Sequence, residues 1–556
     1  MKRCMNMLGP FHRPLINVSS ILHRFGQMRY QTVRNKFILL KTFRDPVHQS
    51  IELSDYLVTI IDTQEFQRLR HIKQLGYAEA VYPGGNHSRF SHSLGTCYLA
   101  GRVMRTLKEK QDLLEISEND IKLVEIAGLC HDLGHGPFSH KFQEVVEKVT
   151  GEKWKHETAS VEILTLISGR LSEKLQLEED YITTIKRIIL GDPPKDKPKK
   201  KFMFQIVCNE DTGIDVDKWD YFARDCHYVG IRNDFDHEHL LKFLRVVQVG
   251  DNYELGFRDK EAENVKALFD TRFKLHRRVY QHRVVGLLEK MINEVLIGYF
   301  NYTEELGETS EFVISKIIDG MRDRENKEVW DESCRKYCQM DDRILSKIAI
   351  SKEPELEPTR DLLKQIEERQ FYKLAAVIQS KPSWSTEEGK DGDERGDFEL
   401  ADQVQAETNP ITFTLDIKIS QDDIEKVLAN DEFKKYSEGF LVVKHKFSHG
   451  KDKHPLLKVP FFKKYQANEI PKGTPLKPHQ IPPSLPKDDQ LEWTVFRVYT
   501  KTPLKKGQTE FRREIDLKLR ALYENRTPED RGKKRKGNSG ERGDVKGARA
   551  NLLDRY

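Results

Sequence analysis

The chain has 556 residues, of which 37% are hydrophobic and 33% are charged, and its formal net charge is +4. This balance is typical of a soluble globular protein with solvated extensions, and no apolar run approaches the roughly 18 residues that a membrane helix needs. The seven cysteines are odd in number and scattered, so no disulfide framework is expected and a reducing, intracellular compartment is predicted.

Residues 1–40 are predicted to form a basic tail, because no Asp or Glu precedes Asp45 whereas nine Lys and Arg residues do. Such a start fits either a disordered arm or a mitochondrial transit peptide. The basic run Arg531 to Lys536 near the other end is typical of a nuclear signal. The nucleus is therefore favoured, with the mitochondrion as the alternative.

Residues 41–375 carry mostly helical patterns. The segments with apolar residues at helical spacing are Ser88 to Lys110, Ile121 to Asp132, Ile182 to Leu190, and Glu261 to Phe300, the last as one or two helices. Asn119 and Asp120 are cap candidates for the second segment. The chain is expected to belong to the mainly α class.

The composition changes after Pro382. Residues 376–408 are predicted to be an acidic linker, since they are poor in apolar residues. Alternating patterns in 412–417, 440–443 and 494–499 then predict strands of a small C-terminal α+β lobe over 409–525. Residues 526–556 are polar and basic and are predicted to be a disordered tail.

The strongest chemical signal is His131-Asp132, within the segment Leu129 to His140, which also holds His135 and His140. Adjacent His and Asp at the end of a helix can converge on one metal ion, because Gly134 lets the chain turn sharply behind them. Packing gives no reason to gather three histidines and an aspartate among glycines, so a metal site is predicted here.

A metal site needs more ligands, and two other segments offer them. His92 lies at the start of an apolar helix, and Asp217 lies in the aromatic stretch Gly213 to Tyr221, where Asp215 and Asp220 are alternatives. Taken alone, His92 is more typical of a buried core histidine. The proposed set is His92, His131, Asp132 and Asp217, which suits a divalent ion such as Mn, Fe, Zn or Mg.

Several long motifs between Thr42 and about Phe300 resemble the HD-domain deoxynucleoside triphosphate triphosphohydrolases. These motifs are Phe66 to Arg70, Arg89-Phe90 with His92 to Gly95, Ile126 to His140, Gly213 to Cys226, and His276 to His282. The animal members also carry a SAM domain, whereas only a short basic tail precedes Lys41, so no SAM domain is expected. The resemblance implies a helical HD core over 41–375, and the four proposed ligands match the metal ligands of the family.

The resemblance also implies a reaction: the family hydrolyses a dNTP to a deoxynucleoside and inorganic triphosphate at one catalytic metal. The candidates for the acid that protonates the leaving oxygen are His135, His140 and His156. The positions that match substrate contacts are Gln74, Leu75, Arg89, Lys218, Tyr221, Asp225, Arg272, Tyr280 and Gln281. Among them, Gln74 and Asp225 match positions that hold the sugar 3′-hydroxyl, and Leu75 and Tyr280 match positions that crowd the place of a 2′-hydroxyl.

The family is activated by GTP and dNTPs bound between the subunits of a homotetramer, and the resemblance implies the same here. The matching positions are Lys41, Asp62, Gln67, Arg70, Arg258, Lys260, Asn264, His282 and Arg283. Three positions depart from the family pattern: Arg44 replaces Asn, His239 replaces Arg, and Gln143 replaces a carboxylate near the candidate acid histidines, where Glu144 is a potential substitute.

Two other functions fit parts of the sequence. Another HD phosphohydrolase, such as a phosphodiesterase or a nucleotidase, would use the same metal ligands. A catalytically weak nucleic-acid-binding protein would use the basic ends and the stretch Lys195 to Lys201, which supply salt-dependent, non-specific affinity.

Overall fold

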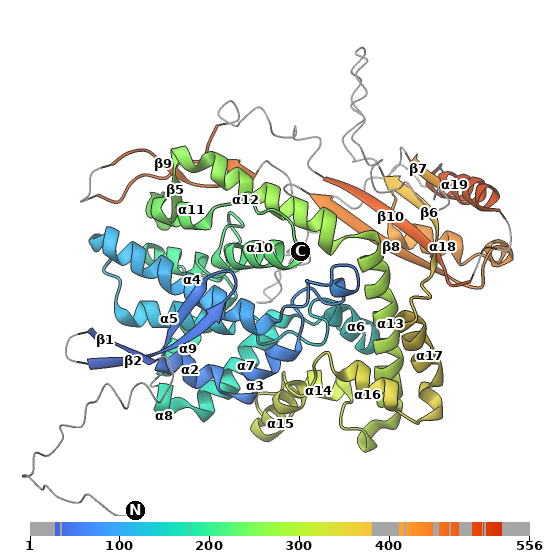
Figure 1. The fold of residues 1–556 in the computed structure, drawn as a ribbon, viewed down its shortest axis with the longest axis horizontal. Coiled ribbons are helices and arrows are strands. Elements are labelled where there is room, and N and C mark those ends of the chain that lie inside the picture. Colours follow the sequence, from blue (N-terminus) through green and yellow to red (C-terminus); the bar gives the residue numbers. More distant parts are fainter. Residues whose placement is uncertain are drawn as a thin grey trace, which may run out of the picture.

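Helices build most of the molecule, which confirms the mainly α class (Figure 1). The computed structural model describes residues 28–33, 36–175, 177–380, 411–415, 419–448, 455–465, 469–477, 492–502, 504 and 507–524. The helices are α2 (Asp55–Ile61), α3 (Gln64–Gln67), α4 (Arg89–Lys110), α5 (Glu118–Cys130), α6 (Lys141–Thr150), α7 (His156–Arg170), α8 (Ser172–Leu175), α9 (Glu179–Ile189), α10 (Val216–Val229), α11 (His237–Phe243), α12 (Ala262–Leu275), α13 (Arg283–Leu306), α14 (Ile314–Gly320), α15 (Lys327–Tyr337), α16 (Ile344–Ile350), α17 (Glu357–Glu367), α18 (Gln421–Leu428) and α19 (Gln508–Glu524).

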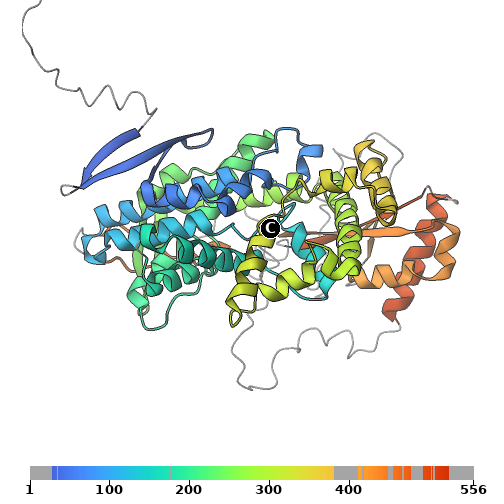
Figure 2. The same ribbon diagram turned by 90° about the horizontal axis from the view of Figure 1, so that it is seen from below.

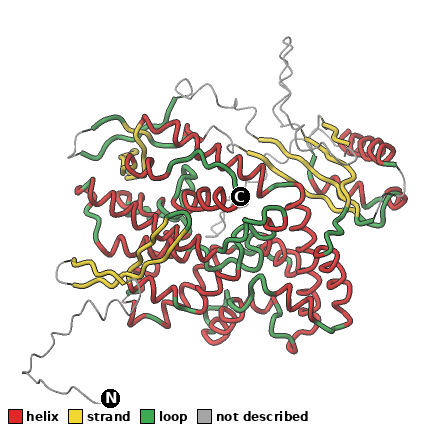
Figure 3. The backbone as a smooth tube through the Cα atoms, in the orientation of Figure 1, coloured by secondary structure: helices red, strands yellow, loops and turns green. Residues whose placement is uncertain are grey.

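The strands form three small sheets at the periphery of the helical body (Figure 3). They are β1 (Met28–Val33), β2 (Lys36–Asp45), β3 (Gln49–Ser54), β4 (Leu244–Val249), β5 (Asn252–Arg258), β6 (Lys373–Ser380), β7 (Ile411–Leu415), β8 (Phe440–Ser448), β9 (Phe461–Phe462) and β10 (Glu492–Thr500). The sheet orders are β1-β2-β3, β4-β5-β9 and β7-β6-β10-β8, and among these described strands β5-β9 and β6-β7 are parallel pairs whereas the others are antiparallel.

Helices α4 and α5 pack closely and set the geometry of the centre. Helix α5 begins with a capping box in which the Ser117 hydroxyl accepts from the Asp120 amide and the Asp120 carboxylate accepts from the Ser117 amide. Ser117 is therefore the cap, and Asp120 completes the box instead of capping the helix itself. A Cβ at Gly128 would lie 3.2 Å from the Cα of Cys97, so this glycine lets α5 approach the backbone of α4. The end of α5 consequently faces the start of α4.

The segment 261–300 forms two helices, and the break between them matters for the centre. Helix α12 ends at Leu275, a π-helical turn follows over His276–Tyr280, and α13 begins after His282, whose ring accepts from the Val284 amide. A π-helical turn inside a helix is often found at functional sites. Here it turns Tyr280 toward Asp225 on α10.

The C-terminal lobe consists of the β7-β6-β10-β8 sheet with α18 and α19, and it has a small hydrophobic core of its own. Helix α13 stands between this sheet and the helical body (Figure 1). Gln281 donates to the Lys446 carbonyl at 2.8 Å, and the Tyr499 hydroxyl donates to the Arg283 carbonyl at 3.0 Å. These bonds tie β8 and β10 to the start of α13.

Residues 28–33 and 36–40, which the sequence assigned to the basic tail, form β1 and the first half of β2 (Figure 2). The β1-β2 hairpin projects from the body at the end opposite to the C-terminal lobe. Strand β6 extends to Ser380, into the expected linker, and the rest of that linker and the 526–556 tail lie outside the described residues. Among the described helices, none has both the length and the apolar character needed to cross a membrane.

Candidate active site

Four side chains converge where the start of α4, the end of α5 and the start of α10 meet. His92 lies in the first turn of α4, His131 and Asp132 follow α5, and Asp217 lies in the first turn of α10. His92 Nε2 is 3.0 Å from Asp217 Oδ1 and 3.5 Å from Asp132 Oδ2. His131 Nε2 is 3.3 Å from Asp132 Oδ1 and 3.4 Å from Asp217 Oδ1. The structure thus brings together the four residues that the sequence proposed as ligands.

These distances fit a shared ion. Bonds of about 2.1 Å to one ion place neighbouring ligand atoms ~3.0 Å apart in an octahedron and ~3.4 Å apart in a tetrahedron. His131 Nδ1 donates to the Gly128 carbonyl at 2.9 Å, so its buried Nε2 faces the carboxylates of Asp132 and Asp217 and offers a lone pair to an ion once its proton is displaced. Two imidazole nitrogens and two carboxylates suit Mn, Fe, Zn or Mg.

A second group of side chains holds His92 in place. His92 Nδ1 donates to Asp220 Oδ2 at 2.7 Å, so its Nε2 faces the other ligands. His48 donates to the other oxygen of Asp220 at 2.7 Å, and Arg224 donates to both oxygens. Asp45 accepts from Arg224 in turn, at 2.7 Å. A carboxylate behind a ligand histidine fixes the tautomer and the orientation of the ring.

The ionisation of the ligands is set by their neighbours. Burial opposes charge on His92, but hydrogen bonds to Asp217 and Asp220 raise its pKa to about 10. Burial also opposes charge on Asp217, and yet His131 and His92 hold the pKa of this carboxyl below its usual range. The carboxylate is therefore ready as an anionic ligand, whereas an incoming ion must displace a proton from His92.

His135, His140 and His156 form a second cluster beside the first. His135 Nε2 is 3.3 Å from Asp132 Oδ1, which links the two clusters. Burial is the main cause that lowers the pKa of all three histidines, and the positive charge of Arg89 adds to it. The three rings are consequently neutral near pH 7 in the ligand-free protein.

The second cluster suits proton transfer better than metal binding. Ring nitrogens of the three histidines lie within 4.8 Å of one another. However, the rings of His135 and His156 are stacked, with centroids 3.8 Å apart and planes 20° apart. Their lone pairs therefore lie in two nearly parallel planes, and such planes do not favour binding of one ion by both rings. Neutral imidazoles in this arrangement can exchange protons or donate hydrogen bonds to an anion.

The departure at Gln143 has a direct structural effect on His156. His156 Nδ1 donates to Gln143 Oε1 at 2.6 Å. Glu144, the potential substitute, instead pairs with Lys290 at 2.6 Å, so it does not replace the expected carboxylate. A carboxylate that the sequence analysis missed is Glu157, whose Oε2 is 3.3 Å from His156 Nδ1. In the sequence, Glu157 reads as an ordinary acidic residue in the first turn of a helix.

Within the loop 133–140, the chain turns at Gly134 as expected, with the His135 amide donating to the Asp132 carbonyl at 3.2 Å. A Cβ at Gly134 would lie 2.1 Å from the His156 carbonyl oxygen, and one at Gly136 would lie 2.1 Å from the Phe142 ring. These glycines are therefore needed for close packing. The left-handed backbone conformation occurs at Phe138, with φ of 58°, and at the next residue, with φ of 61°. Such angles are costly for residues with a Cβ, so other contacts must hold them.

Two residues from distant segments hold the first half of this loop. Arg68 donates to the carbonyls of Leu133 at 3.1 Å and His135 at 2.5 Å. The Tyr337 hydroxyl donates to the Gly134 carbonyl at 2.7 Å. Three successive backbone carbonyls are thereby held beside the metal ligands, and no local sequence pattern indicates either contact.

Asp342 holds the second half of the loop and carries a prediction on stability. Its two oxygens accept from the amides of Phe138 at 2.7 Å and Lys73 at 2.9 Å, and burial raises its pKa to about 7. Between the unfolded value of about 3.9 and pH 7, the folded protein keeps a proton that the unfolded chain has lost, so stability falls as pH rises. Asp342→Asn cannot ionise and should lack this slope.

Urea unfolding of the wild type and Asp342→Asn at pH 5 and pH 8 checks this expectation. From pH 5 to pH 8, the free energy of unfolding of Asp342→Asn should rise relative to that of the wild type by about 2 to 3 kcal/mol. Asp341→Asn, which removes a carboxylate that pairs with Arg343, is the matched control. A difference that stays constant with pH contradicts a titrating Asp342.

Several candidate substrate residues lie near the first cluster. Gln74 is buried, and neither atom of its amide group has a hydrogen-bond partner among the described residues. Asp225 accepts from the Tyr280 hydroxyl at 2.6 Å. Burial raises the pKa of Tyr280, and the negative charge of Asp225 raises it further. Unsatisfied buried amides are rare in folded proteins, so Gln74 indicates a ligand. Buried Tyr221 and half-buried Leu75 and Gln281 are the other non-cationic candidates.

The three candidate cations differ in their surroundings. Arg89 is fully buried, and its NH1 group is 2.6 Å from Asp132 Oδ2. Lys218 Nζ is 2.8 Å from Asp215, which also caps α10. Arg272 is half-buried on α12. The structure does not bring these three into one shared contact, and two of them already have carboxylate partners.

The candidate activator residues lie in three places on the surface. In the first, Lys41 Nζ is 3.6 Å from Asp62 Oδ1, and both side chains are well exposed. Arg70 Nε donates to Gln67 Oε1 at 2.8 Å, and its guanidinium lies 3.5 Å from the centroid of the Phe90 ring. This group is therefore a pre-arranged surface of charged and amide groups on β2, at the ends of α2 and α3, and in the turn after α3.

The second group lies between β5 and the start of α12 and comprises Arg258, Lys260 and Asn264. The remaining pair, His282 and Arg283, lies at the start of α13, beyond the other end of the 14-residue helix α12. Asn264 donates to the Asp236 carbonyl at 2.9 Å, and Lys260 Nζ is 3.5 Å from the centroid of the Phe243 ring. His239, which departs from the family pattern, contacts Glu261 at 2.9 Å. Its ring is therefore already engaged by a carboxylate.

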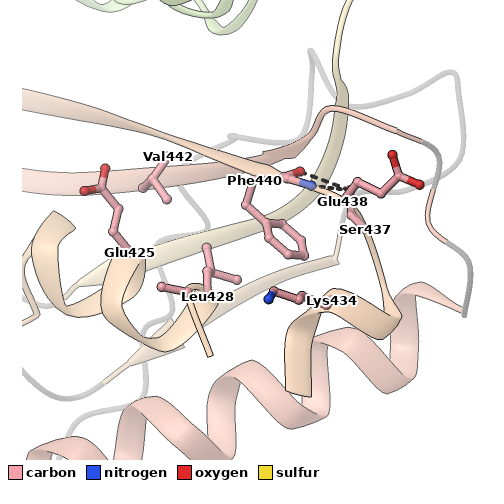
Figure 4. A pocket seen from close by; sticks show the side chains of 9 residues that line it. Glu425, Leu428, Lys434, Ser437, Glu438, Phe440 and Val442 are labelled. Carbon is pink, nitrogen blue, oxygen red and sulfur yellow. Dashed lines mark hydrogen bonds between the residues drawn. The ribbon is translucent and has the colours of Figure 1, made fainter. Parts of the chain in front are cut away.

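A cavity of about 270 Å³ lies in the C-terminal lobe, between α18 and β8 (Figure 4). The ring of Phe440 points into it, with Leu428 and Val442 beside the ring and Glu425, Lys434 and Glu438 around it. None of the candidate metal, catalytic or substrate residues lines this cavity. It is separate from the centre described above.

Comparison with known proteins places this geometry in a family. A profile for the HD domain matches residues 89–225, the stretch that contains all four candidate ligands. Deoxynucleoside triphosphate triphosphohydrolase SAMHD1 from Xenopus laevis is 34% identical over 530 residues, which cover 90% of this chain and 77% of that protein. The human protein of the same name is 39% identical over 440 residues, covering 75% of this chain and 67% of that protein. The chain belongs to the SAMHD1 family.

Other members of the SAMHD1 family match a smaller part. The Gallus gallus protein is 45% identical over 361 residues, which cover 61% of this chain and 57% of that protein. The chain thus spans less than two thirds of the length of several relatives that it matches. The matched HD domain includes the three helices that carry the four ligand candidates, together with the histidine cluster.

Proposed function

We propose that the protein hydrolyses dNTPs to a deoxynucleoside and inorganic triphosphate at the four-residue cluster. The observation that carries this proposal is the convergence of His92, His131, Asp132 and Asp217, with ligand atoms 3.0 to 3.5 Å apart, beside three neutral histidines. The printed names of the relatives, deoxynucleoside triphosphate triphosphohydrolase, support the same reaction.

In this reaction, a water oxygen forms a bond to the α-phosphorus and the bond from phosphorus to the 5′-oxygen breaks. The water proton leaves toward a base, and the 5′-oxygen needs a proton to depart as an alcohol. A divalent ion bound at the cluster would polarise a phosphoryl oxygen and lower the pKa of a water molecule. The buried guanidinium of Arg89 supplies a fixed positive charge beside the phosphate chain.

The three histidines supply the proton for the leaving oxygen. They are neutral without a ligand, because burial lowers the pKa of His135, His140 and His156. A triphosphate brings several negative charges next to them, and a nearby opposite charge favours the protonated imidazole. Substrate binding would therefore raise the pKa of the histidine that it touches and prepare that ring as the general acid.

Recognition of the sugar falls to residues on the other side of the cluster. Gln74 and Asp225 would hold the 3′-hydroxyl, since the Gln74 amide is buried and unsatisfied and a carboxylate has lone pairs to spare. Leu75 and Tyr280 would fill the place of a 2′-hydroxyl. A site without room for a hydroxyl rejects it by steric exclusion and by unpaired desolvation.

We also propose activation by GTP and dNTPs at the candidate activator residues on the surface, in a homotetramer. The exposed carboxylate of Asp62 can accept from the N–H groups of a guanine base, while Arg70 can donate to the ring. The basic residues of the second group, which include Arg258 and Lys260, would bind the phosphates. The oligomeric state with and without nucleotide, measured by light scattering, tests this part.

The decisive test identifies the products. Purified protein with a divalent metal should convert each accepted dNTP to deoxynucleoside and intact triphosphate, separated by ion exchange, and GTP should increase the rate. In ¹⁸O-water the label should appear in triphosphate and not in the deoxynucleoside, because water attacks phosphorus. Pyrophosphate or orthophosphate would favour another HD phosphohydrolase. Nucleic-acid binding without turnover, retained after loss of Asp132, would favour the binding protein.

A further inference from the structure

His87, which is not among the residues predicted from the sequence, belongs to a buried cluster around Asp225. His87 precedes α4, and its backbone carbonyl accepts from the backbone N–H of Gln74 at 2.9 Å. Its side chain is 0% exposed, and Nε2 lies 2.7 Å from Oδ1 of Asp225, which is 1% exposed. The imidazole stacks on the Tyr228 ring, with centroids 4.4 Å apart and planes 17° apart. The ring is therefore held on its face by Tyr228 and at its edge by Asp225.

The contacts of Asp225 define what its carboxylate can still do. His87 donates to Oδ1, and the Tyr280 hydroxyl donates to Oδ2 at 2.6 Å. A carboxylate has about four lone-pair sites, so each oxygen keeps one site for a further donor. With one donor on each oxygen, the carboxylate plane cannot rotate without breaking a buried hydrogen bond. Its remaining acceptor sites therefore have fixed directions.

The neighbouring Gln74 points to a ligand at this place. Both atoms of its buried amide group lack hydrogen-bond partners among the described residues, and its backbone is bonded to that of His87. A hydroxyl group is both a donor and an acceptor, so it can satisfy a carboxylate and an amide at once. Asp225 and Gln74 are suited to bind one hydroxyl together, provided that the carboxylate keeps its orientation.

We propose that His87 is a positioning residue that orients the Asp225 carboxylate for recognition of the sugar 3′-hydroxyl. This inference rests on the proposed function and deepens it, because it assigns sugar selectivity to a residue that would not touch the substrate itself. Removing the His87 donor frees the carboxylate to turn toward other donors, and the hydroxyl loses a directed acceptor. The triphosphate, the metal ligands and the reacting phosphorus are not affected directly.

The test compares two variants with two substrates. His87→Gln places an amide nitrogen near the position of Nε2 and keeps a donor for Asp225, whereas the shorter His87→Asn does not reach. The substrates are a dNTP and its 2′,3′-dideoxy analogue. In His87→Asn, the ratio of kcat/KM for the dNTP to that for the analogue should fall about 10-fold or more from the wild-type ratio, the scale of a hydrogen bond to a charged group. His87→Gln should keep most of the wild-type ratio.

Each outcome has a distinct meaning. If His87→Asn lowers kcat/KM equally for both substrates, or if both variants behave alike, His87 acts only through stability and the inference is wrong. If the wild type turns over no dNTP, the proposed function fails. In that case, the thermal shifts that the dNTP and its dideoxy analogue produce in each protein still test the role of His87, because binding needs no turnover. If the wild type and His87→Asn prefer the dNTP over its dideoxy analogue to the same extent, the inference is overturned.

Discussion

Asp217→Asn is expected to remove most of the bound metal and to lower dNTP hydrolysis by about 100- to 1000-fold, the scale of losing one pre-arranged electrostatic group. The Asp217 carboxylate is 3.0 Å from His92 Nε2 and 3.4 Å from His131 Nε2, so it closes the ligand set. Asparagine keeps the shape but loses the negative charge that a divalent ion needs. Metal content by mass spectrometry and initial rates measure the two effects.

The design of this experiment separates metal loss from misfolding. The side chain of Asp217 is 21% exposed, so the substitution should cost little stability compared with one at a fully buried acid. Asp211→Asn removes an exposed carboxylate that pairs with Lys201, and it should retain both metal and activity. A folded Asp217→Asn protein that keeps a full equivalent of metal would show that the ligand set is wrong.

The sequence indicated those parts of the centre that lie within short segments. His131 and Asp132 stand in one run with His135 and His140, and the apolar spacing of α4 and α5 predicted both helices. The mainly α class follows from the same spacing. These predictions use interactions between residues close in the chain, which is the information that periodicity and motifs contain.

The residues that orient the centre could not be predicted in this way, because each acts over a long sequence distance. His87 meets Asp225 from 138 positions away, and Asp342 meets Phe138 from 204 positions away. No local pattern distinguishes either from an ordinary polar residue. Asp220 is an intermediate case, since it lies three residues after Asp217 on the same helix and only the structure separates the ligand from the residue behind it.

The glycines of the loop 133–140 illustrate a second limit. A glycine in a turn suggests conformational freedom, which is why Gly134 was expected to make the turn. The chain does turn at Gly134, but the close approach of α7 is a second reason for the glycine, and Phe138 takes the left-handed conformation. Close packing between distant segments leaves no trace in the local sequence, so the turn was predicted and the packing was not.

Asp220→Asn tests whether orientation of His92 controls metal affinity. All the groups that contact Asp220 are donors, namely His48, His92 and Arg224. An asparagine amide must present its NH₂ group to at least one of them, and His92 loses part of its anchor. Loss of such a contact behind a ligand lowers metal affinity by about 10- to 100-fold. Competition with a metal chelator measures this affinity, and excess metal should restore activity, because all four ligands remain.

Asp45→Asn is the matched control, since Asp45 also accepts from the buried Arg224 but does not contact His92. Removing either carboxylate weakens a buried ion pair, which costs about 3 to 5 kcal/mol in comparable cases, so both variants should be less stable. Only Asp220→Asn should bind metal more weakly. Equal loss of affinity in both variants would mean that Arg224 and general stability, not the hydrogen bond to His92 Nδ1, set the strength of the metal site.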